Sequence, residues 1–284
     1  MHIAHRKTDL KFDEGAGHNI HGFVPTMGAL HDGHRQLIHT ARANCEFLTV
    51  SIFVNPTQFA PGEDFLEYPR TIGQDVAVLQ ELGVDQLYVP TAEEIYPSGT
   101  MVNITLDPIE YVLEGAQRPG HFSGVANVVL RLFNIVRPDR AYFGEKDAQQ
   151  LIVIKKLVAD LHLPIEIIGS PTVRDKEGMA LSSRNIFLDH EERVQAKSIS
   201  RGLFAAQDAF SSGEVSAQTL RNLVRTELAS HNLLSIEYVS LCRPESMNEV
   251  LGECQEGDVL SVAVRLDSTR LIDNIHLRDC PKSN

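Results

Sequence analysis

The sequence predicts an α/β protein in which a doubly wound parallel sheet is followed by a smaller α+β region. In the first part of the chain, short β-rich runs alternate with stretches whose apolar residues recur at helical spacing, which is typical of a parallel sheet covered by helices. After about Arg184, two amphipathic stretches precede three strand-like runs with short connections, which indicates helices on a small antiparallel sheet. We place the boundary near residues 174–184 and expect domains at 1–174 and 175–284.

Each strand is expected where a β-rich run ends at Pro, Asn or Gly, and each helix where apolar residues recur every three to four positions. In the first domain, the expected strands lie at 22–25, 47–55, 85–90, 140–144 and 165–171, and the expected helices lie at 35–45, 72–83, 124–138 and 147–163. In the second domain, helices are expected at 190–210 and 216–233, and strands at 235–242, 257–266 and 269–277.

Composition narrows the class of function. The net charge is -12, so broad binding to nucleic acid is not expected. No apolar run approaches the roughly 20 residues of a membrane span, and the N-terminal residues lack the apolar stretch of a secretory signal. Cys45, Cys242, Cys254 and Cys280 are scattered without a C-x-x-C pair. That spacing favours a reducing cytoplasm and argues against a disulfide framework or a thiolate zinc site.

The stretch TMGALHDGH joins the first expected strand to the first expected helix. Backbone amide groups at a helix N-terminus favour a phosphate. His31 and His34 lie three residues apart, so they point the same way if the first turn is helical. Gly28 and Gly33 permit a close backbone approach or an unusual φ. The pattern predicts two imidazoles that can donate hydrogen bonds to phosphate oxygens as negative charge builds up there.

Other interpretations of this stretch remain open on the pattern alone. With 12 histidines in the chain, an H-x-x-H pair can arise by chance. A zinc site would need a third ligand at a suitable spacing, and none lies nearby in the sequence. The Walker P-loop pattern and the G-x-G-x-x-G fingerprint are both absent.

Several stretches together resemble one family. PTMGALHDGH (25–34) is similar to the H-x-G-H signature of the nucleotidylyltransferase superfamily, which includes the class I aminoacyl-tRNA synthetases. Further stretches narrow the resemblance to the pantothenate synthetase (pantoate–β-alanine ligase) family. These are SIFVNPTQF (51–59), EGAQRPGHFSGV (114–125), YFGEKDAQQL (142–151), VRDKEGMALSSRN (173–185) and TRLIDN (269–274). The first 22 residues depart from the family pattern, since they are polar and contain glycine where a longer amphipathic helix and a more apolar strand are usual.

The resemblance implies a Rossmann-like fold and a two-step, AMP-forming ligation. ATP and (R)-pantoate would give pantoyl adenylate and pyrophosphate, and β-alanine would then displace AMP to form pantothenate. Charge grows on the phosphate oxygens in the first step, so positioning and electrostatic stabilisation should dominate, with Mg²⁺ on the phosphates. No protein ligand of the metal is predicted. The activated intermediate is an adenylate, so no Ser-His-Asp or reactive-Cys arrangement is needed.

The resemblance also assigns roles to individual residues. His34 matches the family's proton donor, and the other catalytic residues it implies are His31, Lys146, Ser182, Ser183 and Arg184. Contacts to ATP are implied for Met27, Gly28, Ala29, Leu30, His31, Asp32, Gly33, His34, Gly144, Glu145, Lys146, Asp147, Val173, Leu181, Ser182, Ser183 and Arg184. Pantoate is expected at Asn55, Gln58 and Gln150, whose amides offer both donors and an acceptor. Arg118 could attract a carboxylate.

The family is usually dimeric through its N-terminal domain, so we expect a cytoplasmic homodimer with small-molecule substrates and no nucleic-acid or membrane partner. Two alternatives are another H-x-G-H nucleotidylyltransferase and a catalytically silent nucleotide-binding relative. The first would not be expected to carry FVNPTQF or GEKDAQQ. The second would be expected to have lost a histidine, Lys146 or the serine loop, and this chain has all of them.

Residues 175–185 are predicted to form a mobile flap that closes over ATP, as part of a C-terminal lid domain. The segment contains Gly178 and is expected to be short of strong apolar anchors. It also lies between the two predicted domains, where hinges and lids are commonly placed. The alternative is a rigid linker whose serines only cap the next helix.

Overall fold

The computed structural model describes residues 1–12, 19–60, 62–63 and 65–278; Cys280 lies outside them. The chain divides into two compact units. The first comprises Met1–Glu145 and Gln150–Pro171, and the second comprises Lys146–Gln149 and Thr172–Asn284. No helix among the described residues is long and apolar enough to cross a membrane.

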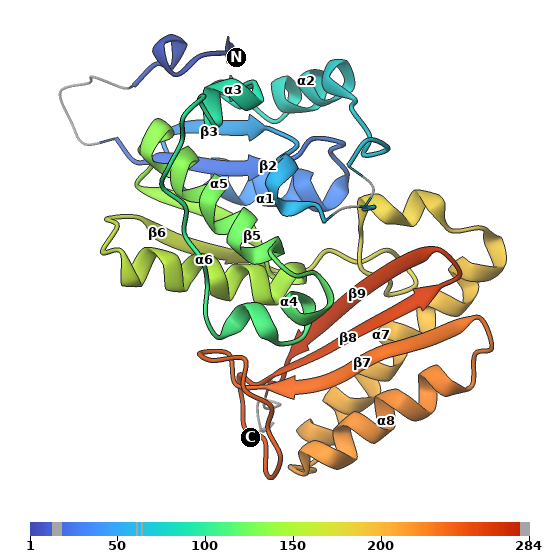
Figure 1. Ribbon diagram of the computed structural model, residues 1–284. Helices are drawn as coiled ribbons and strands as arrows, with labels where there is room; N and C mark the ends of the chain where they lie inside the picture. Colours follow the sequence, from blue (N-terminus) through green and yellow to red (C-terminus); the bar gives the residue numbers. More distant parts are fainter. Residues whose placement is uncertain (13–18, 61, 64, 279–284) are drawn as a thin grey trace. The chain divides into compact units, whose positions relative to one another are not determined.

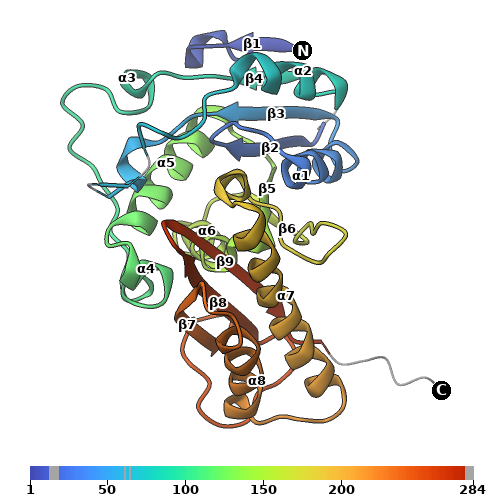
Figure 2. The ribbon, with the colours of Figure 1, turned by 90° about the vertical axis from the view of Figure 1, so that its right-hand side faces the viewer.

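The first unit is built on a six-stranded sheet in the order β1-β4-β3-β2-β5-β6. Figure 1 labels its central strands β2, β3 and β5, and Figure 2 labels all of them. All of its neighbouring strands are parallel. The strands are β1 (His2–Ala4), β2 (His21–Thr26), β3 (Phe47–Ile52), β4 (Gln86–Tyr88), β5 (Arg140–Gly144) and β6 (Glu166–Ser170). The α-helices of this unit are α1 (Asp32–Arg42), α2 (Ile72–Glu81), α3 (Ala92–Ile95), α4 (Glu114–Gln117), α5 (His121–Val136) and α6 (Ala148–Asp160), the last beginning in the residues assigned to the second unit. The predicted doubly wound parallel sheet is confirmed.

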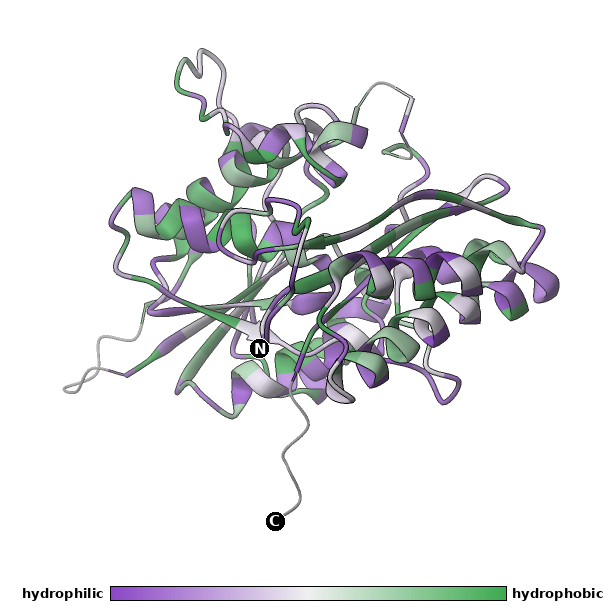
Figure 3. Cartoon of the chain, turned by 90° about the horizontal axis from the view of Figure 1, so that it is seen from below, coloured by the Kyte–Doolittle hydropathy of each residue, from purple (hydrophilic) through white to green (hydrophobic). Residues whose placement is uncertain are grey.

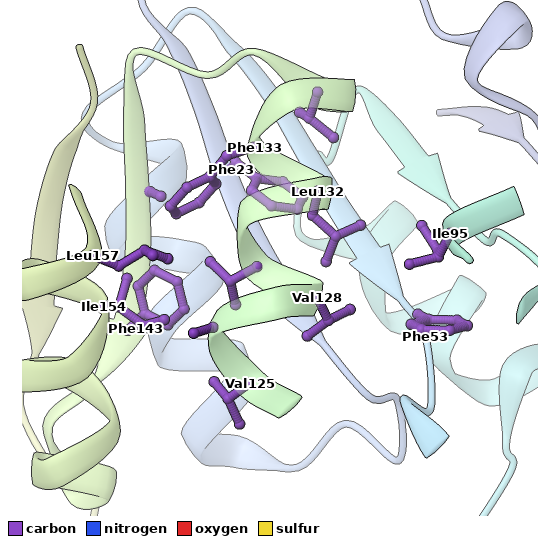
Figure 4. Packing of buried hydrophobic residues seen from close by; sticks show 14 of the residues in the cluster. Phe23, Phe53, Ile95, Val125, Val128, Leu132, Phe133, Phe143, Ile154 and Leu157 are labelled. Carbon is purple, nitrogen blue, oxygen red and sulfur yellow. The ribbon is translucent and has the colours of Figure 1, made fainter. Parts of the chain in front are cut away.

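Helices cover both faces of this sheet, because successive side chains of a strand point to opposite faces. Phe23 and Phe143 pack in one cluster with α5 and α6, whereas the neighbouring Val24 and Tyr142 pack in another with α1 and α2. Figure 2 shows α1 and α5 on opposite sides of the sheet. In the close-up of Figure 4, Val125, Val128 and Leu132 of α5 lie among the side chains of this first cluster.

The second unit packs two helices against an antiparallel sheet. Its elements are α7 (His190–Ser211), α8 (Ala217–Ala229), β7 (Leu234–Cys242), β8 (Val259–Leu266) and β9 (Thr269–His276). The strands run in the order β7-β8-β9. Apolar residues of both helices and all three strands form one core cluster. In Figure 3 the long strands are mostly green, while the helices carry purple stretches between green ones, which is the amphipathic pattern that the sequence predicts.

Every predicted helix and strand exists, and the differences lie mainly at the boundaries. The strand expected at 47–55 ends at Ile52, and the helix expected from 124 begins at His121. The short edge strand β1 was not predicted; three residues carry too little periodicity, and pairing with β4 stabilises it. A 3₁₀-helix at Lys7–Asp9 also precedes β2, and the described residues before Asp32 hold no α-helix, in keeping with the polar N-terminal sequence.

Candidate active site

The candidate residues of the first unit lie at the carboxyl ends of neighbouring parallel strands. From β2 the chain builds toward β3 and β4 on one side, and later adds β5 and β6 on the other. The topological switch point therefore lies between β2 and β5, and ligands of such sheets bind outside the carboxyl ends of the strands there. Met27–His34 follow β2, Asn55 and Gln58 follow β3, and Glu145 follows β5.

The turn after β2 depends on backbone conformations that its sequence permits. Gly28 has φ +84° and Ala29 has φ 52°, so both lie in the left-handed region. A Cβ at position 28 would lie 3.0 Å from Ile52 Cγ2 and 3.1 Å from Asp75 Oδ2, so glycine is needed there for space as well as for φ. Asp75 on α2 is only 2% exposed.

The carboxylate of Asp75 holds this turn in place. Oδ2 accepts the backbone N–H of Ala29 at 3.1 Å, and Oδ1 accepts that of Leu30 at 2.8 Å. Thr71 also donates its hydroxyl to Oδ2 at 3.1 Å. Both carboxylate oxygens are thus used to fix the approach to α1. The buried Asp75 thus fixes the backbone that leads into α1.

The two histidines of the H-x-G-H stretch lie side by side at the start of α1. Their ring centroids are 4.1 Å apart, so the predicted common orientation is confirmed. His31 Nδ1 accepts the N–H of Gly33 at 3.1 Å, and His34 Nδ1 accepts the N–H of His31 at 3.3 Å. Because each Nδ1 is an acceptor, the proton of each neutral imidazole is on Nε2. Each ring therefore carries its N–H donor on Nε2.

The predicted pantoate residues after β3 belong to a buried polar network. Asn55 is 1% exposed and Gln58 is 9% exposed. Asn55 Nδ2 donates to Gln58 Oε1 at 3.1 Å and to Gly124 O at 3.3 Å. Gln58 Nε2 in turn contacts Met27 Sδ at 3.3 Å. The structure therefore brings Asn55, Gln58 and Met27 together, whereas Gln150 lies half-buried in the first turn of α6.

Tyr96 completes this network, although the sequence analysis did not identify it. Its hydroxyl donates to Asn55 Oδ1 at 2.9 Å. Burial raises the pKa of Tyr96 above its ordinary value, so the hydroxyl keeps its proton at neutral pH. The guanidinium of Arg131 lies 4.9 Å from the centre of the Tyr96 ring, close enough for a cation–π contact.

Helix α5 approaches this network closely because it carries Gly124. A Cβ at position 124 would lie only 2.4 Å from Thr57 O, so any side chain there would push α5 away from the residues after β3. His121 at the start of α5 binds Gln58 O through Nδ1 at 2.8 Å. Burial, aided by the positive charge of Arg118, lowers the pKa of His121 to about 4. His121 is thus neutral at physiological pH and donates its Nδ1 proton to the Gln58 carbonyl.

Arg118 binds a carboxylate of the protein itself. It forms a two-pronged ion pair with Glu63, with N–O distances of 2.8 and 2.7 Å. A third nitrogen lies 3.0 Å from His121 Nε2. Burial opposes ionisation of Glu63, but the hydrogen bonds and charge of Arg118 outweigh it and lower the Glu63 pKa. Arg118 is therefore paired with Glu63 in this structure, and a contact between Arg118 and a substrate carboxylate stays a prediction.

The GEKD stretch spans the border between the two units. Gly144 ends β5, and Glu145–Asp147 form a 3₁₀ turn before α6. The Lys146 side chain is 19% exposed, and its Nζ lies 3.4 Å from Asp147 Oδ1. Within the second unit, Asn274 of β9 donates to Lys146 O at 2.7 Å. This contact ties the lysine backbone to the antiparallel sheet.

In the second unit, the residues before α7 form an anchored turn. Arg174 pairs with Asp273 at 2.6 Å and donates to Gly178 O at 3.1 Å. Met179 is 4% exposed and packs in the core of this unit. The expectation that 175–185 lacks strong apolar anchors is therefore wrong at Met179, because the sequence does not show that its side chain turns inward.

The serine loop follows directly after this turn. Leu181 N–H binds Val173 O at 2.9 Å, which places these two predicted ATP contacts side by side. Ser182 Oγ accepts the N–H of Arg184 at 3.2 Å and caps the 3₁₀-helix Ser183–Phe187. Capping is what the rigid-linker interpretation expects of a serine here. The closure of a flap over ATP stays a prediction.

Sequence reasoning missed four residues that shape these sites. Asp75 looks like any polar position of an amphipathic helix, and Tyr96 follows a helix of one turn, so neither carries a signal in a single sequence. His121 and Asp273, in contrast, lie inside the stretches RPGHF and TRLIDN that carry the family resemblance. They could have been identified there as buried polar residues.

Comparison with known proteins identifies the family. The family model described as "Pantoate-beta-alanine ligase" matches residues 3–276. A pantothenate synthetase from Chloroflexus aggregans is 50% identical over 274 residues, covering 96% of this chain and 99% of that protein. One from Aquifex aeolicus is 46% identical and covers 89% of each chain.

Solved structures agree with these relatives. The pantothenate synthetase of Thermus thermophilus has a TM-score of 0.92 and 42% identity, covering 98% of this chain and 99% of that one. The pantoate-beta-alanine ligase of Francisella tularensis, complexed with "Beta-gamma ATP and Beta-alanine", has a TM-score of 0.78 and 34% identity and covers 99% of both. The chain therefore belongs to the pantoate–β-alanine ligase family, whose members join pantoate and β-alanine into pantothenate with the use of ATP.

Proposed function

We propose that this ligation proceeds through a pantoyl adenylate. A carboxylate oxygen of (R)-pantoate attacks the α-phosphorus of ATP, a new P–O bond forms, and the bond to the leaving pyrophosphate breaks. The amine of β-alanine then attacks the acyl carbon, the C–N bond of pantothenate forms, and AMP leaves with the former carboxylate oxygen. The amine gives up its proton to solvent. Both steps need stabilised phosphate charge and an ordered acyl group.

The pair His31 and His34 carries this proposal. Both Nδ1 atoms accept backbone N–H groups, so each neutral ring has its proton on Nε2 and can donate it to a phosphate oxygen. His34 is proposed as the proton donor. Residues 27–33 would contact ATP through a turn whose backbone Asp75 fixes. The left-handed Gly28 supports this role, since it leaves room for the backbone to approach a ligand closely.

The remaining ATP contacts are proposed for residues near the border of the two units. Lys146 would act as a compact positive charge on a phosphate, next to Gly144, Glu145 and Asp147. Ser182, Ser183 and Arg184 would supply two hydroxyls and a cation, next to Val173 and Leu181. The proposal is that both sets act in the same reaction, with residues 175–284 serving as the lid domain.

Pantoate is proposed to bind Asn55, Gln58 and Gln150. Asn55 and Gln58 are buried and hydrogen-bonded to each other, which supports a fixed polar site for a small hydroxy acid. We propose that Mg²⁺ arrives on the ATP phosphates, because Mg²⁺ prefers phosphate oxygens and water to a protein cage, and we assign it no protein ligand.

Two further properties are proposed from the surface and the cysteines. A homodimer through the first unit is supported by large apolar residues on its surface, since Met101 is 92% and Val102 is 78% exposed. Light scattering of the purified protein tests this. A cytoplasmic location is supported by Cys45, Cys242 and Cys254, which are buried free thiols.

Pyrophosphate exchange tests the adenylate most simply. The purified protein should incorporate labelled pyrophosphate into ATP when pantoate and Mg²⁺ are present and β-alanine is absent. Reversal of the first step is the physical reason, since it remakes ATP from the adenylate. Exchange at the same rate with and without pantoate, or exchange that requires a nucleotide or tRNA instead, would contradict the proposed function.

A further inference from the structure

The side-chain amide of Asn55 has only one orientation that satisfies its neighbours. The backbone N–H of Thr57 donates to Asn55 Oδ1 at 3.3 Å, and Asn55 Nδ2 donates to the carbonyl oxygen of Gly124 at 3.3 Å. A backbone N–H can only donate and a carbonyl oxygen can only accept. Turning the amide over would set N–H against N–H on one side and oxygen against oxygen on the other. The backbone alone therefore fixes the direction of Asn55.

Tyr96 stabilises this orientation of the Asn55 amide by a hydrogen bond to its oxygen. Its hydroxyl donates to Asn55 Oδ1 at 2.9 Å. The hydroxyl of Thr57 lies 3.0 Å from the same oxygen and 3.1 Å from the Tyr96 oxygen, so it can donate to either of them. Arg131, stacked 4.9 Å from the centre of the Tyr96 ring, limits the positions that this ring can take.

The orientation of the Asn55 amide also fixes the orientation of the Gln58 amide. Asn55 Nδ2 points at Gln58 Oε1 at 3.1 Å, so Gln58 must present its carbonyl oxygen to Asn55 and its NH₂ group to the other side. On that side the Gln58 amide meets Met27 Sδ at 3.3 Å. A thioether is a weak acceptor. The buried NH₂ group of Gln58 is therefore held in place without a strong acceptor in that contact.

The backbone of Gln58 is fixed in the same way. His121 donates its Nδ1 proton to Gln58 O at 2.8 Å, and Arg118 lies 3.0 Å from the other ring nitrogen. Since Arg118 can only donate, that nitrogen is the acceptor. Neither the side-chain amide nor the backbone carbonyl of Gln58 can turn over without loss of a hydrogen bond.

We infer that Tyr96 is a positioning residue that acts through Asn55 to hold the NH₂ group of Gln58 toward the substrate, so that Gln58 binds a hydrogen-bond acceptor. This rests on the proposed function, in which Gln58 binds pantoate. The group that Gln58 recognises is then an oxygen with a lone pair, such as a carboxylate oxygen of pantoate or the acyl oxygen of its adenylate. A substrate that offered only a donor at this point would be rejected.

The test compares the half-buried Tyr96 with the buried Tyr88 in pantoate-dependent pyrophosphate exchange. Tyr96→Phe removes one donor to Asn55 with almost no change of shape. Tyr88→Phe is the matched control, because Tyr88 is fully buried and its hydroxyl has no hydrogen-bond partner among the described residues. Tyr96→Phe should raise the KM for pantoate about three- to tenfold and leave the KM for ATP unchanged. Tyr88→Phe should leave both unchanged.

A second variant is designed to turn over the side-chain amide of Gln58. Asn55→Asp keeps an acceptor for Thr57 and Tyr96 but places an oxygen against Gly124 O and Gln58 Oε1. Gln58 should then turn its NH₂ group toward position 55 and present its oxygen to the substrate. The KM for pantoate should rise more than in Tyr96→Phe, by about 30-fold or more. Circular dichroism and unfolding curves should show that this variant is folded.

The outcomes separate the inference from the proposed function. Wild-type exchange that does not need pantoate would remove the proposed function itself. Pantoate-dependent wild-type exchange, with a Tyr96→Phe enzyme that has the wild-type KM for pantoate, would overturn only the inference. An equal rise of both KM values in Tyr96→Phe would also overturn it, because it would show a general structural role.

Discussion

Two segments that carry proposed ATP contacts are each held by one buried carboxylate, but in different ways. In the first unit, Asp75 accepts the backbone N–H groups of Ala29 and Leu30 directly. In the second unit, Asp273 binds the side chain of Arg174, which in turn donates to the backbone oxygen of Gly178. The buried acid thus fixes the first turn directly at its backbone, whereas in the second turn it acts through one long side chain. The half-buried Asp175 adds backbone contacts to the second turn, since its Oδ1 accepts the N–H groups of Glu177 and Met179 at 2.9 and 3.0 Å.

The difference predicts which property a substitution changes most, the position of the turn or the stability of the fold. A substitution at Asp75 removes contacts to the backbone that leads into the histidines, so it should alter their position more than the stability of the fold. A substitution at Asp273 takes the charged partner away from the partly buried guanidinium of Arg174, so it should cost stability first. Met179, buried in the core of the second unit, adds a further anchor to that turn. The predictions below test this contrast.

The largest effect is expected at Asp273. Asp273→Asn should lower the free energy of unfolding by about 3 kcal/mol, because Arg174 would lose the negative charge and one of the two acceptors of a carboxylate that is only 4% exposed. Urea unfolding followed by circular dichroism measures this. Glu177→Gln is the matched control, since it breaks the pair between Lys197 and the exposed Glu177 and should cost about 0.5 kcal/mol or less. Equal losses in the two variants would remove the anchoring role of Asp273.

Acid should weaken the first unit through His121. Folding lowers its pKa from 6.5 to about 4, so between these pH values the unfolded chain binds more protons than the folded one. The contribution of His121 to the free energy of unfolding should therefore be constant above about pH 6.5 and decrease by about 3 kcal/mol as the pH falls toward 4.

Unfolding curves at a series of pH values test the role of His121. In His121→Gln this part of the pH dependence should disappear, because glutamine does not titrate. The control His39→Gln changes an exposed histidine and should keep it. An unchanged pH profile in His121→Gln would show that another group is responsible.

Asp75→Asn should reduce the rate of pyrophosphate exchange by about 100-fold, since a displacement of a catalytic turn by about 1 Å can have that effect. An amide has one acceptor where the carboxylate has two, so the N–H of Ala29 or Leu30 would face an NH₂ group. Thr71→Val removes only the hydroxyl contact to Asp75 and should have an effect of a few-fold. Near-normal exchange in a folded Asp75→Asn protein would show that the turn keeps its position without the acid.

The smallest effect is expected at Gln150. If it binds pantoate, Gln150→Ala should raise the KM for pantoate about tenfold, the cost of one lost hydrogen bond in a buried site, with much less effect on ATP. Steady-state exchange at varied pantoate measures this. A variant with the wild-type KM for pantoate would remove Gln150 from the site.

Much of the fold could be predicted from the sequence, because long helices have strong periodicity and the central strands are short β-rich runs that end at turn residues. β2, β3 and β5 alternate between two covered faces, and α7 and α8 carry a clear apolar stripe. The three-residue β1 could not be predicted in this way, since its stability comes from pairing with β4. The left-handed Ala29 was also missed, because alanine gives no sign of such a conformation.

The candidate site shows the same division. Motif residues such as His31, His34 and Gln58 can be identified from the sequence because they lie in stretches that together match the family pattern. The residues that position them come from distant segments, as Asp75 does for the histidine turn and Tyr96 does for Asn55. Such contacts depend on tertiary packing, and a single sequence has no local signal for them.

The central claim is that pantoate is activated as an adenylate, and the fate of one oxygen atom tests it most directly. Pantoate labelled with ¹⁸O in its carboxylate is incubated with the enzyme, ATP, Mg²⁺ and β-alanine, and the products are analysed by mass spectrometry. The adenylate route predicts one ¹⁸O atom in AMP and none in pyrophosphate, because the carboxylate oxygen that attacked the α-phosphorus leaves with it. The label in pyrophosphate, or in inorganic phosphate formed together with ADP, would contradict the account.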